Sequence, residues 1–165
     1  MTKPESESTV TQSLVDRLID KEPQSNSDAY VTRPQSVRQL KANLRRDLEW
    51  LLNSRQNPDA VSEGFPDLSR SLYNYGLPDF SALSLNSPKD RNWLLRYLAT
   101  TVETFEPRLR EVRVSLLETP NSTARVLRFQ IEALLMMDPA PEQVSFDTVL
   151  QLTSGEYQIR GERSA

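Results

Sequence analysis

The stretch from Arg91 to Leu117 changes its hydrophobic period in the middle, and this change limits how the chain can fold. Before Pro107 the apolar residues recur every three or four positions, as on one face of a helix: Leu94, Leu98, Val102 and Phe105. After it, apolar and polar residues alternate from Val112 to Leu116, which is typical of a strand with one buried face. Because proline lacks an amide hydrogen and disfavours helical geometry in the preceding residue, we expect the helix to end near Glu106.

The corner between this helix and this strand carries two opposite charges, Glu106 and Arg108, on either side of Pro107. A carboxylate and a guanidinium held at a rigid turn can form a charge-assisted pair of defined geometry. The sequence therefore predicts a partner-binding element made of Glu106, Pro107 and Arg108. An alternative, in which the pair only closes the corner locally, stays open at this point.

The composition excludes several classes of protein. The 165 residues contain no cysteine and no histidine, which excludes disulfide scaffolds, thiolate zinc sites and histidine-dependent catalytic triads. The net charge of −3 gives no overall basic field for nucleic acid. The N-terminal sequence MTKPESESTV lacks the apolar core of a signal peptide, and no apolar run approaches the roughly 18 residues that cross a bilayer. We therefore expect a soluble protein without metal, cofactor or membrane insertion.

Residues 1–35 are expected to form a flexible extension with one short helix at about residues 13–20. Ser13 can cap this helix, and its apolar residues share one face: Leu14, Val15, Leu18 and Ile19. A helix this short is marginal alone, so we expect it to dock on the domain or on another protein. Residues 36–162 are predicted to form a single domain.

The clearest helix is predicted to begin at Ser36, in a capping box with Gln39, and to end at about Asn53. Its apolar residues form one stripe: Val37, Leu40, Leu44, Leu48 and Leu51. Trp50 falls on the opposite side, beside a basic flank. Since tryptophan and arginine are common interface anchors, Trp50 is a candidate partner-binding residue. A solvated face with an aromatic lid over a neighbouring loop would explain the same pattern.

Two further helices are predicted before the corner. The first has three residues on one face: Leu68, Leu72 and Tyr75. Gly76 suits the left-handed position that ends a helix, with Leu77 folding back on Leu72. The second begins after the cap Ser87 and runs to the corner.

After the corner, alternating segments predict antiparallel strands at 109–118, 124–136 and 144–152, with a shorter one at Tyr157 and Ile159. Turns are predicted at 119–123 and 153–155. This order predicts an α+β fold, with N-terminal helices packed on one face of a C-terminal antiparallel β-sheet of three to four strands. At least one sheet edge should stay unpaired, with charged residues placed to protect it or give it specificity: Arg160, Glu162 and Arg163.

Several segments carry a resemblance to a known family: SLVDRL, VRQLKANLRRDLEWLLNSR, YGLPDFSAL, FEPRL and the strands that lead to the closing SGE turn. In this order they resemble TssE proteins, the baseplate subunits of bacterial type VI secretion systems. They are also similar to the homologue in contractile phage tails, a small baseplate wedge protein sometimes called lysozyme-like. The resemblance covers roughly residues 12–162, and SLVDRL favours the secretion subunit.

The resemblance implies a structural, non-enzymatic protein of the baseplate wedge, at the cytoplasmic side of the bacterial inner membrane. It implies TssF, TssG and TssK as neighbours, a role in nucleating the TssB/TssC sheath, and proximity to the tube proteins Hcp and VgrG. Glu106, Pro107 and Arg108 match the family's Glu-Pro-Arg motif and would contact the wedge or the sheath. An edge of the sheet would pair with a sheath strand.

Two other functions account for less of the sequence. A lysozyme-like hydrolase of peptidoglycan needs two carboxyls about 5 to 10 Å apart, and Glu103 and Glu106 could approach one another. However, Arg108 beside Glu106 favours the ionised carboxylate, which is the wrong form for a general acid. A nucleic-acid-binding module could use the basic flank of the second helix, but Asp47 and Glu49 interrupt it.

Overall fold

The computed structural model describes residues 9–19, 23–24, 31–59, 64–80, 87–117, 126–151 and 155–164, the last four by their backbone alone. The turn predicted at 119–123, and all but Gly155 of that at 153–155, lie outside the described residues. The chain divides into two compact units, Met1–Arg46 and Asp47–Ala165. The predicted bounds of an extension and a domain, 1–35 and 36–162, stay a prediction.

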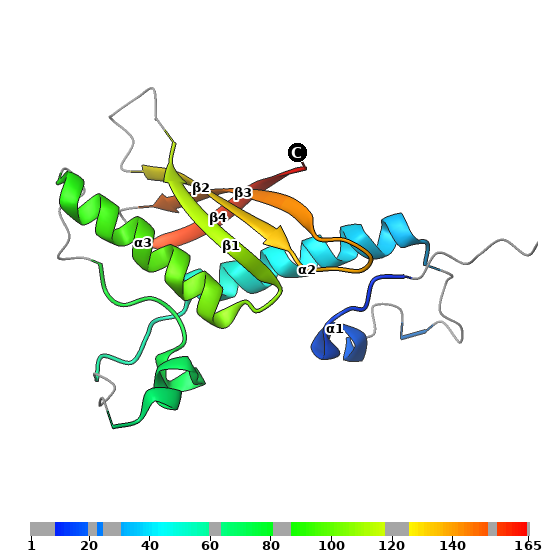
Figure 1. Cartoon of the computed structure of the whole chain (residues 1–165), viewed down its shortest axis with the longest axis horizontal. Coiled ribbons are helices and arrows are strands. Elements are labelled where there is room, and N and C mark those ends of the chain that lie inside the picture. The colour runs from blue at the N-terminus through cyan, green and yellow to red at the C-terminus, as the bar shows by residue number, and fades with distance from the viewer. Residues whose placement is uncertain are drawn as a thin grey trace, which may run out of the picture. The chain divides into compact units, whose positions relative to one another are not determined.

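Helices precede strands along the described chain, as predicted (Figure 1). The helices are α1 (Leu14–Leu18), α2 (Arg33–Asn53), the 3-10 helices η1 (Pro66–Arg70) and η2 (Leu72–Asn74), and α3 (Pro88–Phe105). The strands are β1 (Leu109–Leu116), β2 (Val126–Leu135), β3 (Glu142–Gln151) and β4 (Glu156–Ser164). The predicted α+β class is confirmed. No helix in the described part of the chain is long and apolar enough to cross a membrane.

Within the first unit, α1 is held by its polar residues. Ser13 caps it as predicted, because the Ser13 hydroxyl accepts a hydrogen bond from the Asp16 amide at 3.2 Å. The Asp16 carboxylate, 4% exposed, forms an ion pair with Arg46 at 2.8 Å. The apolar side chains, by contrast, are exposed, with Leu14 at 72% and Leu18 at 76%. The helix therefore attaches to α2 through its polar side.

The start of α2 differs from the prediction. It begins at Arg33, and the amide and hydroxyl of Thr32 both donate to the Gln35 side chain, at 2.9 and 3.0 Å. The Ser36 hydroxyl instead donates to the Arg33 carbonyl at 2.8 Å. The predicted box of Ser36 and Gln39 is wrong because an equivalent Thr-x-x-Gln pair lies one turn earlier. The end at Asn53 is as predicted, and four of the five stripe residues are buried: Leu40, Leu44, Leu48 and Leu51.

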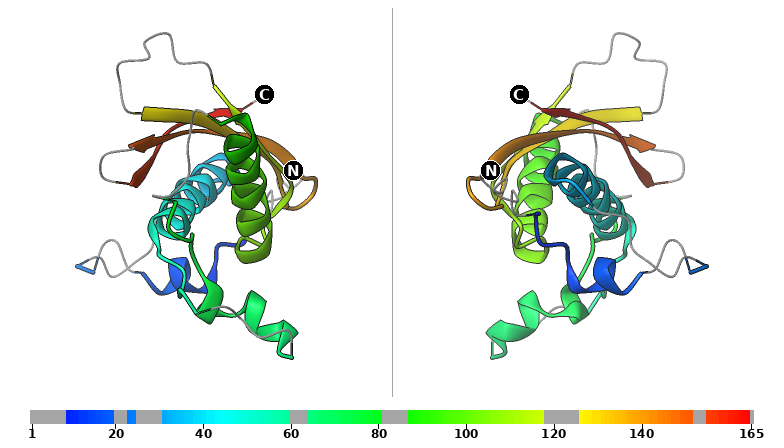
Figure 2. Two further views of the ribbon diagram at one scale, coloured as in Figure 1. Left: turned by 90° about the vertical axis from the view of Figure 1, so that its left-hand side faces the viewer. Right: turned by 90° about the vertical axis from the view of Figure 1, so that its right-hand side faces the viewer.

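The sheet of the second unit is an antiparallel meander in the order β1-β2-β3-β4. Its inward-facing residues on β2 and β3 alternate as predicted, and the central pair Ile131 and Phe146 is fully buried. Strand β4 is longer than predicted, since it pairs with β3 as far as Val144 and Ser164. The end of α2 and α3 both lie on one face of this sheet (Figure 2). The core lies between them: Leu48, Leu52, Leu94, Leu98, Val102, Phe129, Ile131, Val144 and Phe146.

Strand β1 contains a β-bulge between Arg110 and Arg113 that the alternation did not predict. Leu109 and Val112 are both buried although they are three residues apart, so one extra residue must be accommodated between them. Glu111 provides it with φ of 54°, in the left-handed region that costs energy for a residue with a Cβ.

The segment predicted as a third helix forms η1 and η2 instead of an α-helix, with Leu72 86% exposed. Short polar side chains compete for the local backbone: Ser69 donates to the Pro66 carbonyl at 2.6 Å, and Ser71 to the Leu68 carbonyl at 2.8 Å. The predicted left-handed glycine is confirmed, because Gly76 has φ of 104°.

The predicted return of Leu77 onto Leu72 is wrong. Leu77 is buried, whereas Leu72 is exposed. The Leu77 amide donates to the Ser54 carbonyl at 2.8 Å, and the Gln56 amide donates to the Leu77 carbonyl at 2.9 Å. The chain after Gly76 is thus fixed against the end of α2, where a Cβ on Gly76 would collide with the Ser54 carbonyl oxygen.

Candidate functional site

The corner, defined as Glu106 to Arg108, is fixed by backbone contacts on both sides. Helix α3 begins after the predicted cap Ser87 and ends at Phe105, with the Glu106 amide donating to the Val102 carbonyl at 2.8 Å. The Arg108 carbonyl accepts from the Met136 amide at 2.8 Å, which joins the corner to the end of β2. Since Pro107 cannot continue the helix, the chain turns directly into β1.

Glu106 and Arg108, on either side of Pro107, form a bidentate ion pair. Arg108 Nε donates to Glu106 Oε1 at 2.6 Å, and Nη2 donates to Oε2 at 2.5 Å. Glu106 is 6% exposed, whereas the Arg108 side chain is 23% exposed. The hydrogen bonds that Arg108 donates to Glu106 raise the pKa of Arg108; burial opposes this rise and Asp47 reinforces it. The parallel donor geometry fixes the orientation of both side chains.

A third residue, Asp47 of α2, completes this cluster. Arg108 Nη2 donates to Asp47 Oδ2 at 2.6 Å. One guanidinium thus joins the carboxylates of Asp47 and Glu106, which lie 59 residues apart in the chain. The cluster carries two negative charges and one positive charge, and is therefore negative overall. We call Asp47, Glu106 and Arg108 the corner triad. It ties the end of α2 to the junction between α3 and β1.

Tyr75 lies beside the corner triad. Its ring meets that of Phe105 edge-on, with ring centroids 5.3 Å apart. Burial, together with the negative charges of Asp47 and Glu106, raises the pKa of Tyr75. The surroundings of the triad are thus partly aromatic, and the burial of Glu106 strengthens its pairing with the guanidinium.

Trp50, the other predicted site residue, is exposed on α2, at 57%. It lies three residues after Asp47, and residues at this spacing are neighbours on a helix surface. The sequence placed Trp50 correctly on an open face, and Glu106 and Arg108 correctly together. Their part in binding a partner stays a prediction.

The sequence treated Asp47 only as an interruption of the basic flank, and so missed its role in the corner triad. One signal was present, because Asp47 falls three residues after Leu44 and four before Leu51, at the margin of the buried stripe. A carboxylate in that position needs a cationic partner. Which cation it meets depends on the tertiary fold.

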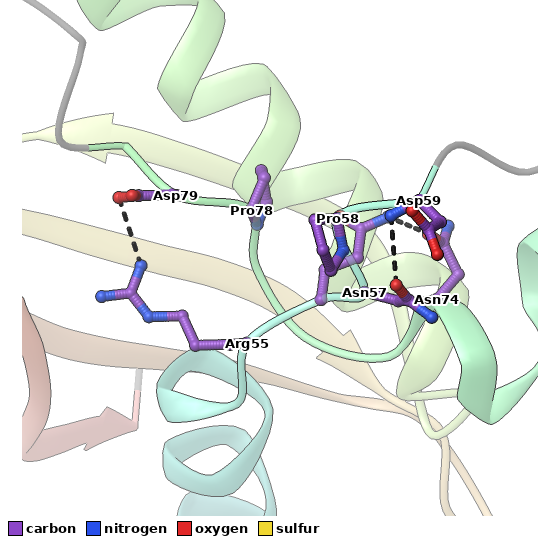
Figure 3. Close-up of a pocket in the computed structure, with 8 residues that line it drawn as sticks. Arg55, Asn57, Pro58, Asp59, Asn74, Pro78 and Asp79 are labelled. Atoms are coloured by element: carbon purple, nitrogen blue, oxygen red, sulfur yellow. Dashed lines mark hydrogen bonds and ion pairs between the residues drawn. The ribbon is translucent and has the colours of Figure 1, made fainter.

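A surface cavity of about 530 Å³, shown in Figure 3, has no residue of the corner triad in its lining. Its lining is mostly polar: Arg55, Gln56, Asn57, Pro58, Asp59, Asn74, Pro78 and Asp79. The ion pair across it, Arg55 to Asp79 at 3.5 Å, joins side chains that are 63% and 70% exposed. Such exposed pairs contribute little energy. Among the described residues, no group of three or more acidic side chains is placed to hold a metal ion.

Residues 38–140 match the model of a protein family described as "Baseplate wedge protein gp25". The matched stretch includes α2 from Arg38 onwards, α3, the whole corner triad, and β1 and β2. A search of curated proteins finds no match to the chain.

Proposed function

The chain belongs to the family of the baseplate wedge protein gp25, and on this premise we propose that it is the TssE subunit of a type VI secretion baseplate. The choice of a secretion machine over a phage tail rests on the SLVDRL segment, which resembles the start of TssE proteins. In this role the protein joins the wedge and helps to nucleate the contractile sheath. It acts as a structural subunit and not as an enzyme.

The partners in this proposal are TssF, TssG and TssK in the wedge and TssB/TssC in the sheath, close to the Hcp tube and VgrG. The protein would work at the cytoplasmic side of the inner membrane, without inserting into it. An edge strand of its sheet would pair with a strand of the first sheath ring.

The observation that carries the proposal is the corner triad. The Glu106 carboxylate is buried and fixes the orientation of Arg108, while the side chains of Arg108 and Asp47 are each 23% exposed. A partner would therefore meet the partly exposed side chains of Arg108 and Asp47, held at a fixed spacing. Charges arranged in this way set the orientation of a partner more than they add affinity. Trp50, beside Asp47 on α2, would supply an apolar anchor next to them.

The same triad argues against the hydrolase alternative. Glu106 is bonded at both oxygens by Arg108, and the Glu103 carboxylate accepts the Val112 amide at 3.1 Å. Both candidate carboxylates thus hold structure together rather than facing a substrate. We expect the purified protein to release no sugar from peptidoglycan above a buffer control.

The proposal is tested by sheath assembly in a bacterium that carries the secretion system of this chain. Arg108→Ala and Asp47→Asn are introduced in a strain with a fluorescent TssB, with Arg96→Ala on the exposed face of α3 as the control. We expect extended sheaths to disappear in both triad variants and to persist in the control. Asp47→Asn leaves the ion pair of Glu106 and Arg108 intact, so a loss of sheaths in this variant indicates a docking defect and not a folding defect. Normal sheaths in both triad variants would refute the role assigned to the corner.

A further inference from the structure

Each edge strand of the sheet is partly closed by helix side chains, β1 at Val112 and β4 from Tyr157 to Ile159. The Asn53 side chain pairs with Tyr157 as a neighbouring strand would: its amide donates to the Tyr157 carbonyl at 3.0 Å, and its oxygen accepts the Tyr157 amide at 2.9 Å. One turn earlier on α2, Glu49 accepts the Ile159 amide at 3.0 Å. We call Glu49 and Asn53 the edge cap.

The edge cap cannot move aside easily, because the end of α2 is anchored in the core. Leu48, Leu51 and Leu52 are each no more than 2% exposed. Withdrawing this turn of helix would expose three buried leucines to water, which is strongly unfavourable. The outer edge of β4 from Tyr157 to Ile159 is thus closed to an incoming strand.

The outer edge of β1 is closed at one position only among the described residues, where Glu103 accepts the Val112 amide. The Leu117 amide donates to the Arg128 carbonyl of β2 at 2.8 Å. Because backbone groups alternate in direction along a strand, those of Val114 and Leu116 face away from β2. Their side chains are half-buried apolar groups at the margin of the sheet.

We infer that β1, at Val114 to Leu116, is the edge to which an extended segment of a partner chain adds, and that β4 at Tyr157 to Ile159 is not. This inference rests on the proposed function, in which a sheath strand joins the sheet, and it selects the edge. An apolar side chain of that segment would cover Val114 and Leu116 on the helix-covered face.

The charges on the exposed face of β1 indicate which side chains the partner segment should have on that face. Arg110 and Arg113 are exposed on β1. A partner strand would therefore alternate apolar residues, facing the helices, with acidic or polar residues, facing these two arginines. A second copy of this chain is the alternative occupant of this edge, and the crosslinking experiment below distinguishes it from a sheath strand.

Amide hydrogen exchange on the free protein tests the two edges without any partner. We expect the amides of Val114 and Leu116 to exchange at least about tenfold faster than those of Tyr157 and Ile159, which the edge cap protects. In Asn53→Ala, the Tyr157 amide should lose most of that protection while Val114 is unchanged. Equal or reversed rates in the native protein would overturn the inference.

Site-specific crosslinking tests the partner. The chain has no cysteine, so Ser115→Cys on β1 and Gln158→Cys on β4, both at exposed positions, each give one attachment point for a benzophenone maleimide. The labelled proteins are assembled with the wedge subunits and TssB/TssC and then irradiated. We expect a sheath crosslink from Ser115 at least about five times stronger than from Gln158.

The outcomes separate the inference from the proposed function. Sheath recruitment with a stronger crosslink from Gln158, or with none from either position, overturns the inference and leaves the function standing. A crosslink between two copies through Ser115 overturns the choice of partner. If the native protein recruits neither wedge nor sheath, the proposed function fails, and the choice of a sheath strand fails with it.

Discussion

At the scale of single residues, Arg108 separates two carboxylates that would otherwise repel each other. Glu106 is nearly enclosed and Asp47 is partly open, so the guanidinium serves both the interior and the surface. A purely local role and a docking role therefore share the same hydrogen bonds. Asp47→Asn distinguishes the two roles, because it removes the negative charge of Asp47 and leaves the ion pair of Glu106 and Arg108 intact.

Glu111 gives a prediction about backbone strain. Its φ of 54° is unfavourable for a residue with a Cβ and worst for a β-branched one. We expect Glu111→Val to be less stable than Glu111→Gly by about 1 to 2 kcal/mol, from urea unfolding followed by circular dichroism. Arg113→Val, at an ordinary strand position nearby, is the control and should change stability little. Equal stability of the two Glu111 variants would show that the bulge relaxes when this residue changes.

Two tyrosines give a matched prediction about buried hydroxyls. The Tyr157 hydroxyl is buried without a hydrogen-bond partner among the described residues, whereas the Tyr97 hydroxyl donates to Gln56 at 2.7 Å. Tyr157→Phe should therefore be neutral or stabilising by about 1 kcal/mol, and Tyr97→Phe destabilising by about 1 kcal/mol. Thermal unfolding measures both. A loss of stability in Tyr157→Phe would mean that its hydroxyl has a partner.

At the scale of elements, α1 depends on one carboxylate. Burial would raise the pKa of Asp16, but the hydrogen bonds from Ser13 and Arg46 outweigh it and hold the pKa below its usual value. A lowered pKa means that the attachment of α1 is fully stabilised above about pH 4, where the unfolded residue is ionised, and weakens as the pH falls further.

We expect the amide resonances of Ser13 to Leu18 to move toward unfolded positions between pH 4 and pH 2, as followed by NMR. In Asp16→Asn, α1 should be loosely attached already at pH 6, and the transition should disappear. The same transition in the variant would assign the effect to another carboxyl group.

The bulge in β1 and the paired 3-10 helices both arise where local patterns compete. Regular alternation in β1 would bury either Leu109 or Val112 but not both, and the bulge buries both. Between Pro66 and Asn74, serine hydroxyls take backbone partners that an α-helix would need. In β1 the bulge buries apolar residues that regular alternation would leave out, whereas in η1 and η2 the predicted apolar face does not form and Leu72 is exposed.

At the scale of the whole molecule, the second unit has a core of its own, made by the end of α2, α3 and the sheet. We expect a chain lacking residues 1–24, and hence α1, to keep the circular dichroism of the native sheet and to unfold cooperatively. The control is Leu48→Ala in the shortened chain, which removes a buried side chain and should cost about 2 to 5 kcal/mol. A shortened chain without cooperative unfolding would contradict a self-sufficient second unit.

The arrangement of the second unit is consistent with the proposed role as a baseplate subunit. The corner triad fixes the junction between helices and sheet, and the edge cap closes one side of that sheet. Under the proposed function, the corner triad would present charges of fixed orientation and β1 would present a strand edge, and neither would require a conformational change on binding.

The sequence by itself determined the features that depend on neighbouring residues. Pro107 and the change of period located the corner, Ser13 and Ser87 marked helix starts, and alternation located the strands. Each of these signals acts over a few residues, through steric exclusion or a single local hydrogen bond, so it can be recognised without the fold.

Only the tertiary structure decided which distant groups meet. The bond from Arg108 to Asp47 spans 61 residues, and those that form the edge cap span 104 and 110. Asp47, Glu49 and Asn53 look in the sequence like ordinary polar residues of an amphipathic helix. They gain their roles because the packing of buried leucines sets the position of the end of α2 against β4 and the corner, and this packing depends on residues far apart in the chain.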